Sequence, residues 1–215
     1  MTTLNDLVQR TITRLSMVNG TSVQTYAEDR IASYIQDKFN ALFDEAWWDQ
    51  FVDRITLTLD GVSGTHTGDL SLLVKRYQDI QKVFPEGSDK CLTRLPTTIN
   101  AARLSGGTPI YISAQPNMNK VFRVYPINAI GNINIVYRTK PDRFLPNDIV
   151  NFDEDALVLG AAYDYASDDA TNPMQVDKLK VMFESRVLQL KEALMDVATT
   201  LDPMFPDAAN SCWLS

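Results

Sequence analysis

One stretch before residue 167 is apolar almost throughout, and in two stretches near the start of the chain and one near its end apolar residues recur every three or four positions. Such spacing predicts amphipathic helices. The predicted helices cover about residues 3–18, 25–46, 153–167 and 173–200. The last has the strongest pattern, because its apolar residues step by 3 or 4 from Val176 through Leu201.

Residues typical of helix ends support these four predictions. Thr3 can cap the first helix, and Thr25 with Glu28 forms the capping-box spacing at the second. Asn172 is a favoured cap, and Pro173 suits a first helical position. The third helix opens on carboxylates, which favour the positive end of a helix dipole. It is then apolar nearly all round from 156 to 166, so we expect it to be buried, with small residues at 160–162 that admit a neighbouring backbone.

The middle of the chain alternates or contains short apolar runs typical of strands. Strands are predicted at 54–60, 79–84, 109–114, 120–126 and 132–139, the last three as an antiparallel meander, with short helices at 70–76 and 97–104. The predicted fold is α+β: a helical bundle of 3–48 plus 153–201 with an antiparallel β-rich insertion at about 51–140. Residues 1–202 would form a single domain. Residues 203–215 contain two prolines and no periodicity, which predicts an extended C-terminal arm.

Composition is that of a folded protein: 45% of the 215 residues are hydrophobic and 22% are charged. The net charge of −7 argues against a general nucleic-acid binder. Two cysteines far apart, Cys91 and Cys212, favour a reducing compartment. We expect neither a signal peptide nor a membrane-spanning segment.

Catalytic and metal-binding motifs are weak. His66 is the only histidine, and we interpret it as a solvated loop residue rather than a metal ligand or an acid/base catalyst. Asp60 and Asp69 flank a loop without calcium-loop spacing. Asp168 and Asp169, with Asp164 nearby, fit a polar helix-to-helix turn better than a pair of catalytic carboxylates. We therefore predict no enzyme activity, no cofactor and no metal; an enzyme with an unrecognised site is the remaining alternative.

Charge is unevenly distributed along the chain. Residues 141–170 contain eight acids and one base, whereas residues 75–103 contain six bases and three acids. Two interpretations stay open: solvated faces, or a contact between unlike patches of neighbouring copies. A contact between unlike patches is heterologous and closes into a ring when its rotation fits.

The predicted arm contains large apolar side chains in a segment too rich in proline to fold alone. They are Met204, Phe205, Trp213 and Leu214. The arm packs on its own domain or anchors in a partner, where a buried aromatic residue such as Trp213 contributes strongly to binding.

The order of elements and several short motifs resemble the head-to-tail adaptor (connector) proteins of tailed bacteriophages. The motifs are two N-terminal helices within 4–46, the run 79–84, a Y-R-x-x-P segment at 137–141, and an A-L-x-x-G-A helix after an acidic start. The resemblance covers about residues 4–200.

This resemblance implies a structural virion protein at the neck, assembled in the host cytoplasm. It would form a ring of about twelve copies beneath the portal, with tail or nozzle proteins below and DNA passing through without specific binding. The arm would contact the portal. The candidates for contacts between ring subunits are Arg138, Lys140, Arg143, Asp153 and Asp155. The alternative is another neck or tail component: a stopper, a tail terminator or a tail-tubular subunit.

Overall fold

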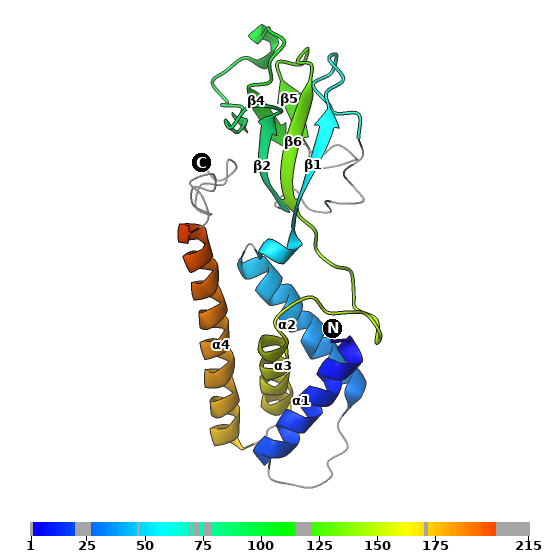
Figure 1. Ribbon diagram of the computed structural model, residues 1–215, viewed down its shortest axis with the longest axis vertical. Helices are drawn as coiled ribbons and strands as arrows, with labels where there is room; N and C mark the ends of the chain where they lie inside the picture. The colour runs from blue at the N-terminus through cyan, green and yellow to red at the C-terminus, as the bar shows by residue number, and fades with distance from the viewer. Residues whose placement is uncertain are drawn as a thin grey trace. The chain divides into compact units, whose positions relative to one another are not determined.

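The computed structural model describes residues 2–19, 27–46, 48–68, 70, 74, 79–114, 122–169 and 172–200, without the side chains of 18, 19, 49, 114 and 195–200. The chain divides into two units. A helical unit consists of Met1–Gln50 and Pro141–Asp202, and a β-rich unit contains Phe51–Lys140. Figure 1 shows the helices and antiparallel strands that confirm the predicted α+β class. The predicted arm at 203–215 lies outside the described residues.

The helical unit is built around its third helix. It contains α1 (Leu4–Asn19), α2 (Glu28–Glu45), α3 (Glu154–Asp168) and α4 (Pro173–Thr200). α3 packs against the other three, which flank it in Figure 1. Most of α3 is buried because it is apolar on nearly all sides, as predicted.

Side chains, not a neighbouring backbone, occupy the space that Gly160 leaves open. A Cβ atom at Gly160 would lie 2.9 Å from both Lys38 Cγ of α2 and Phe183 Cε2 of α4. The expected backbone approach at the small residues of α3 is therefore wrong at this position. Glycine here admits an aromatic ring and an aliphatic stem.

Two predicted caps are present. The Thr3 Oγ1 atom accepts a hydrogen bond from the Asp6 N–H, and the Asn172 Oδ1 atom accepts one from the Met174 N–H. The predicted capping box involves Thr25, which lies outside the described residues; α2 begins at Glu28, with Ala27 at the cap position. The Glu28 carboxylate accepts a hydrogen bond from the Gln9 amide of α1 at 3.0 Å, which links the first two helices.

The long apolar stripe of α4 is only partly covered. Leu179 is fully buried, whereas Phe183, Val187, Leu190 and Leu194 are half-buried. The helix and its bounds are as predicted, but the expectation that the whole stripe is core is wrong. α4 lies at the side of the helical unit. In the described part of this unit, its principal contact with another helix is the one with α3.

The β-rich unit contains two three-stranded sheets. The first has the order β1-β6-β2, with β1 (Val52–Thr58), β2 (Ile80–Pro85) and β6 (Asn132–Arg138) antiparallel. The second has the order β3-β4-β5, where β4 (Tyr111–Ala114) pairs antiparallel with β5 (Phe122–Tyr125) and parallel with β3 (Thr93–Arg94). Ile135 of β6 lies opposite both Ile55 and Val83, so β6 is the central strand.

The predicted meander of 109–139 is therefore wrong: β5 and β6 belong to different sheets. β6 is buried at Ile133 and at every position from 135 to 138, which favours the centre of a sheet over an edge. Pro126 directly follows β5 and has no N–H with which to extend the pairing. The helix predicted at 97–104 is a single 3₁₀ turn, η3 (Ala101–Arg103); most of the one predicted at 70–76 lies outside the described residues.

His66 is buried, not solvated, so that expectation is wrong. Its Nδ1 atom lies 2.7 Å from the Gly68 carbonyl oxygen, and its ring lies 5.2 Å from the Phe122 ring, centroid to centroid. Leu59 and His66 form an isolated antiparallel β-bridge, which places the histidine next to the buried Leu59. The core around them joins both sheets, with Leu57, Ile80, Val83, Ile112, Val124 and Ile133 among its members.

Candidate functional site: an ion-pair network around α3

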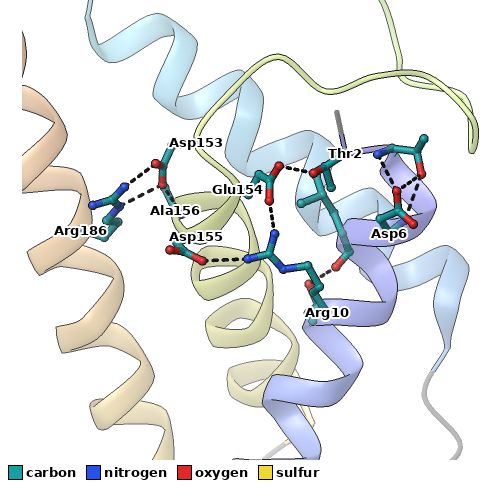
Figure 2. Close-up of polar contacts among 11 residues, drawn as sticks. Thr2, Asp6, Arg10, Asp153, Glu154, Asp155, Ala156 and Arg186 are labelled. Atoms are coloured by element: carbon teal, nitrogen blue, oxygen red, sulfur yellow. Dashed lines mark hydrogen bonds and ion pairs between the residues drawn. The ribbon is translucent and has the colours of Figure 1, made fainter.

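The acidic start of α3 binds two neighbouring helices, as Figure 2 shows. Asp153 caps α3 by accepting a hydrogen bond from the Ala156 N–H at 2.8 Å. The Arg186 guanidinium of α4 donates to both oxygens of the same carboxylate, at 3.1 and 2.6 Å. Burial alone would raise the pKa of Asp153, but these donors outweigh burial and hold that pKa below its ordinary value.

The next two carboxylates reach the first helix. Arg10 of α1 forms ion pairs with Glu154 and with Asp155, the second at 3.0 Å. The Thr2 hydroxyl also donates to Glu154 (Figure 2). This hydroxyl, and after it the Arg10 guanidinium, lowers the pKa of Glu154 despite slight burial. Three successive residues of the chain therefore link α3 to α1 and α4.

The other end of α3 binds α2 in the same way. Arg30 pairs with Asp169 at 2.8 Å and with Asp168 at 3.3 Å. The Tyr34 hydroxyl donates to Asp168 and is the first cause of its lowered pKa. Lys38 pairs with Asp164 at 2.9 Å, yet burial raises the pKa of Asp164 above its ordinary value.

The network changes the interpretation of the acidic run. Six of the eight acids at 141–170 form ion pairs inside their own helical unit: Asp153, Glu154, Asp155, Asp164, Asp168 and Asp169. Both interpretations left open by the sequence placed these charges outward, and Glu154, Asp155, Asp168 and Asp169 are indeed exposed by 38–63%. Their ion pairs also connect α3 with α1 and α2, and Asp153 and Asp164, which are largely covered, connect it with α4 and α2. Part of the acidic surplus is therefore paired within this unit.

The sequence-predicted interface residues fall into separate groups. Asp153 and Asp155 lie together at the start of α3, whereas Arg138 ends β6. Arg138 is 6% exposed, and its Nε atom donates to the Asp79 carboxylate at 2.9 Å. Lys140 is half-buried and Arg143 is exposed in the segment that follows. Met204, Phe205, Trp213 and Leu214 lie outside the described residues.

Sequence reasoning missed the basic partners of the network, Arg10, Arg30, Lys38 and Arg186. Each is a single basic residue within an amphipathic helix, so no local sequence motif distinguishes it from an ordinary surface charge. The one usable signal was the acidic excess of 153–169, which needs cations from elsewhere if the segment is buried.

Neither metal-site geometry nor a membrane span occurs in the part of the chain that the structure describes. No group of three or more histidine, cysteine, aspartate or glutamate side chains there can hold a metal ion. Of the helices described, none is long and apolar enough to cross a membrane. The carboxylates at 164–169 form ion pairs with Lys38 and Arg30.

A family model described as SU10 adaptor protein matches residues 2–204. The chain belongs to this family of phage head-to-tail adaptors. The match to the adaptor family spans the helical unit, the β-rich unit and the whole ion-pair network, and it confirms the resemblance seen in the sequence. No curated protein matches the adaptor chain.

Proposed function

We propose that this adaptor forms a ring beneath the portal of a tailed phage, connects head to tail there and extends the DNA channel. The observation that carries the proposal is the family match over residues 2–204, which includes every described element. The function is mechanical: the helical unit provides a stiff body, and the β-rich unit presents loops to the next component.

The ion-pair network supports this mechanical function. A connector must keep its shape while neighbouring proteins bind and DNA passes. Two pairs of the network, Asp153 with Arg186 and Asp164 with Lys38, are largely removed from water, and such pairs favour one arrangement of α2, α3 and α4 over others. The pairs of Arg10 and Arg30 are exposed and add little stability of their own. Asp153 illustrates this, because one carboxylate is at once the cap of α3 and the anchor of Arg186 from α4.

We further propose that the segment after Asp202 docks on the portal through Met204, Phe205, Trp213 and Leu214. Among the charged candidates, Arg143 suits a contact between subunits best, because its side chain is exposed. Arg138, Asp153 and Asp155 form ion pairs within the chain.

The testing experiment is electron cryomicroscopy of the native particle. A ring of this chain stacked on the portal is the expected result, and density further down the tail would assign it to another tail component. Portal binding is then measured for the full chain, for a chain ending at Asp202 and for Trp213→Ala. The truncated chain should keep its helical circular dichroism and lose portal affinity; equal affinity would refute the proposed arm.

A further inference from the structure

The two units carry opposite net charges. Residues 51–140 contain 11 basic and 6 acidic residues, a net charge of +5. Residues 1–50 and 141–202 contain 9 basic and 20 acidic residues, a net charge of −11. Opposite fields of this size orient the approach of two copies, because unlike units attract and like units repel.

The β-rich unit also presents an exposed apolar group at one end, which we call the tip: Val62, Ile110, Ile127 and Ile130, exposed by 76%, 47%, 45% and 67%. Three loops meet there. The Ile130 N–H donates to the Gly107 carbonyl at 3.0 Å, and a Cβ at Gly61 would lie 2.9 Å from Ile130 Cγ2. The loops adjoin the end of the sheet where Thr58 of β1 pairs with Asn132 of β6 (Figure 1).

The tip is fixed rather than loosely held. The Asp60 carboxylate accepts from the N–H groups of Val62 and Ser63, at 3.1 and 3.0 Å, and from the Thr65 hydroxyl at 2.7 Å. Gly61 has a φ of +68°, a conformation that favours glycine. An apolar surface held in one shape loses little conformational entropy when it binds.

The helical unit carries a second exposed apolar group, the outer stripe of α4: Met174, Val181 and Leu188, exposed by 78%, 63% and 57%. Residues seven apart lie on one helix face, and this face is opposite the buried Leu179. Asp177, Glu184 and Glu192 lie beside the stripe by helical position, with Lys178 as the nearest base, and the exposed Lys180 lies 3.9 Å from the Glu184 carboxylate. The outer stripe is therefore apolar at its centre and acidic at its margin.

We infer that the tip of one copy docks on the outer stripe of α4 in the next copy. Each surface is apolar, and each belongs to a unit whose charge attracts the other. Contacts between two tips or between two stripes would bring like-charged units together. A contact between unlike surfaces is heterologous, so each copy uses both surfaces and the chain of contacts can close into a ring. The inference deepens the proposed function and rests on it for the ring.

The test uses three substitutions that each add one negative charge at a well-exposed apolar position: Val62→Glu in the tip, Val181→Glu in the stripe and Met17→Glu as the control. Met17 of α1 is 72% exposed and belongs to neither surface. Self-association of the full chain is followed by native mass spectrometry and sedimentation. Val62→Glu and Val181→Glu should each weaken it at least tenfold, and Met17→Glu should change it less than twofold. Val62→Gln and Val181→Gln check that loss of apolar contact alone also weakens association.

Mixing the two variants decides the pairing. Val62→Glu keeps an intact stripe and Val181→Glu an intact tip, so an equimolar mixture should form mixed pairs and stop at two copies. A wild-type chain that stays monomeric up to about 1 mM, a variant that associates like the wild type, or a mixture without pairs would overturn the inference. Portal binding is measured separately. A chain that binds the portal but fails these tests would refute the contact between tip and stripe and leave the proposed function intact.

Discussion

Asp153 shows how one residue can decide the arrangement of three helices. Its carboxylate caps α3, binds Arg186 of α4 and lies next to the Glu154 that binds Arg10 of α1. Asparagine at this position can still cap a helix but cannot form the ion pair. Asp153→Asn therefore isolates the charge from the cap.

We expect Asp153→Asn to lower the free energy of unfolding by about 1–2 kcal/mol at pH 7. The pKa of Asp153 is lowered in the folded state, so its contribution is present above the unfolded pKa of about 3.9 and is lost as pH falls through the folded value. Urea unfolding of wild type and variant from pH 7 to pH 3 measures this. A difference that does not shrink in acid would show that the charge is not its cause.

Asp164→Asn is the matched contrast, because burial raises the pKa of Asp164 in the folded state. A raised acidic pKa means that the ionised form costs stability above it, and that this cost vanishes as pH falls. The asparagine variant should be as stable as wild type, or more stable, at pH 7, with no advantage left in acid. The same urea series measures it. Destabilisation at pH 7 would mean that the pair with Lys38 outweighs burial.

Arg138, a candidate for contacts between subunits, forms a buried ion pair within its own unit. Its guanidinium is buried against Asp79, which is itself 2% exposed. Arg138→Ala would leave that carboxylate buried without this cation, at a cost of about 3–5 kcal/mol. The double variant Arg138→Met/Asp79→Leu should recover much of the loss. Thermal unfolding of the single and double variants measures both, and a stable Arg138→Ala protein would instead support a role between subunits.

At the scale of elements, α4 shows that the periodicity of apolar residues predicts a helix but not how deeply each apolar residue is buried. The 3–4 spacing predicted its bounds, but spacing alone does not say how much of a stripe a neighbour covers. Leu179 is fully buried, and Leu190 is half-buried.

Leu179→Ala should therefore cost about 2–5 kcal/mol and Leu190→Ala distinctly less. The reason is that truncating a half-buried side chain removes fewer contacts and leaves a smaller cavity. Denaturant unfolding of the two variants provides the comparison. Equal losses would place Leu190 in the core, as the sequence pattern suggested.

The sequence predicts elements well where local chemistry decides and poorly where distant partners decide. The 173–200 helix follows from Asn172, Pro173 and the apolar spacing. The separation of β5 from β6 depends on β1 and β2, which lie far away in sequence. The same limit applies to the candidate site: the acids of α3 were visible, but Arg10 and Arg186 come from other helices and carry no local signal.

At the scale of the whole molecule, the two units each have an apolar core of their own. The β-rich unit packs Leu57, Val83 and Ile135 together, whereas the helical unit buries Leu7, Phe39 and Leu157. A unit with its own core can open without its neighbour. The sequence instead predicted one domain over residues 1–202, so the degree of cooperativity is a measurable question.

Amide hydrogen exchange of the Leu179→Ala variant tests whether the two units unfold independently. The substitution weakens the helical core, so exchange at the amides of α1, α2, α3 and α4 should accelerate by the factor that corresponds to the measured loss of stability, tenfold for each 1.4 kcal/mol. Amides of β1, β2 and β6 should keep their wild-type exchange rates, because their hydrogen bonds open only when the β-rich unit opens.

Val83→Ala, in the core of the β-rich unit, should give the reverse pattern. Equal acceleration throughout both units for either variant would mean that they unfold as one domain, as the sequence suggested. The unequal pattern would mean that contacts made by the tip can change without disturbing the ion-paired helices.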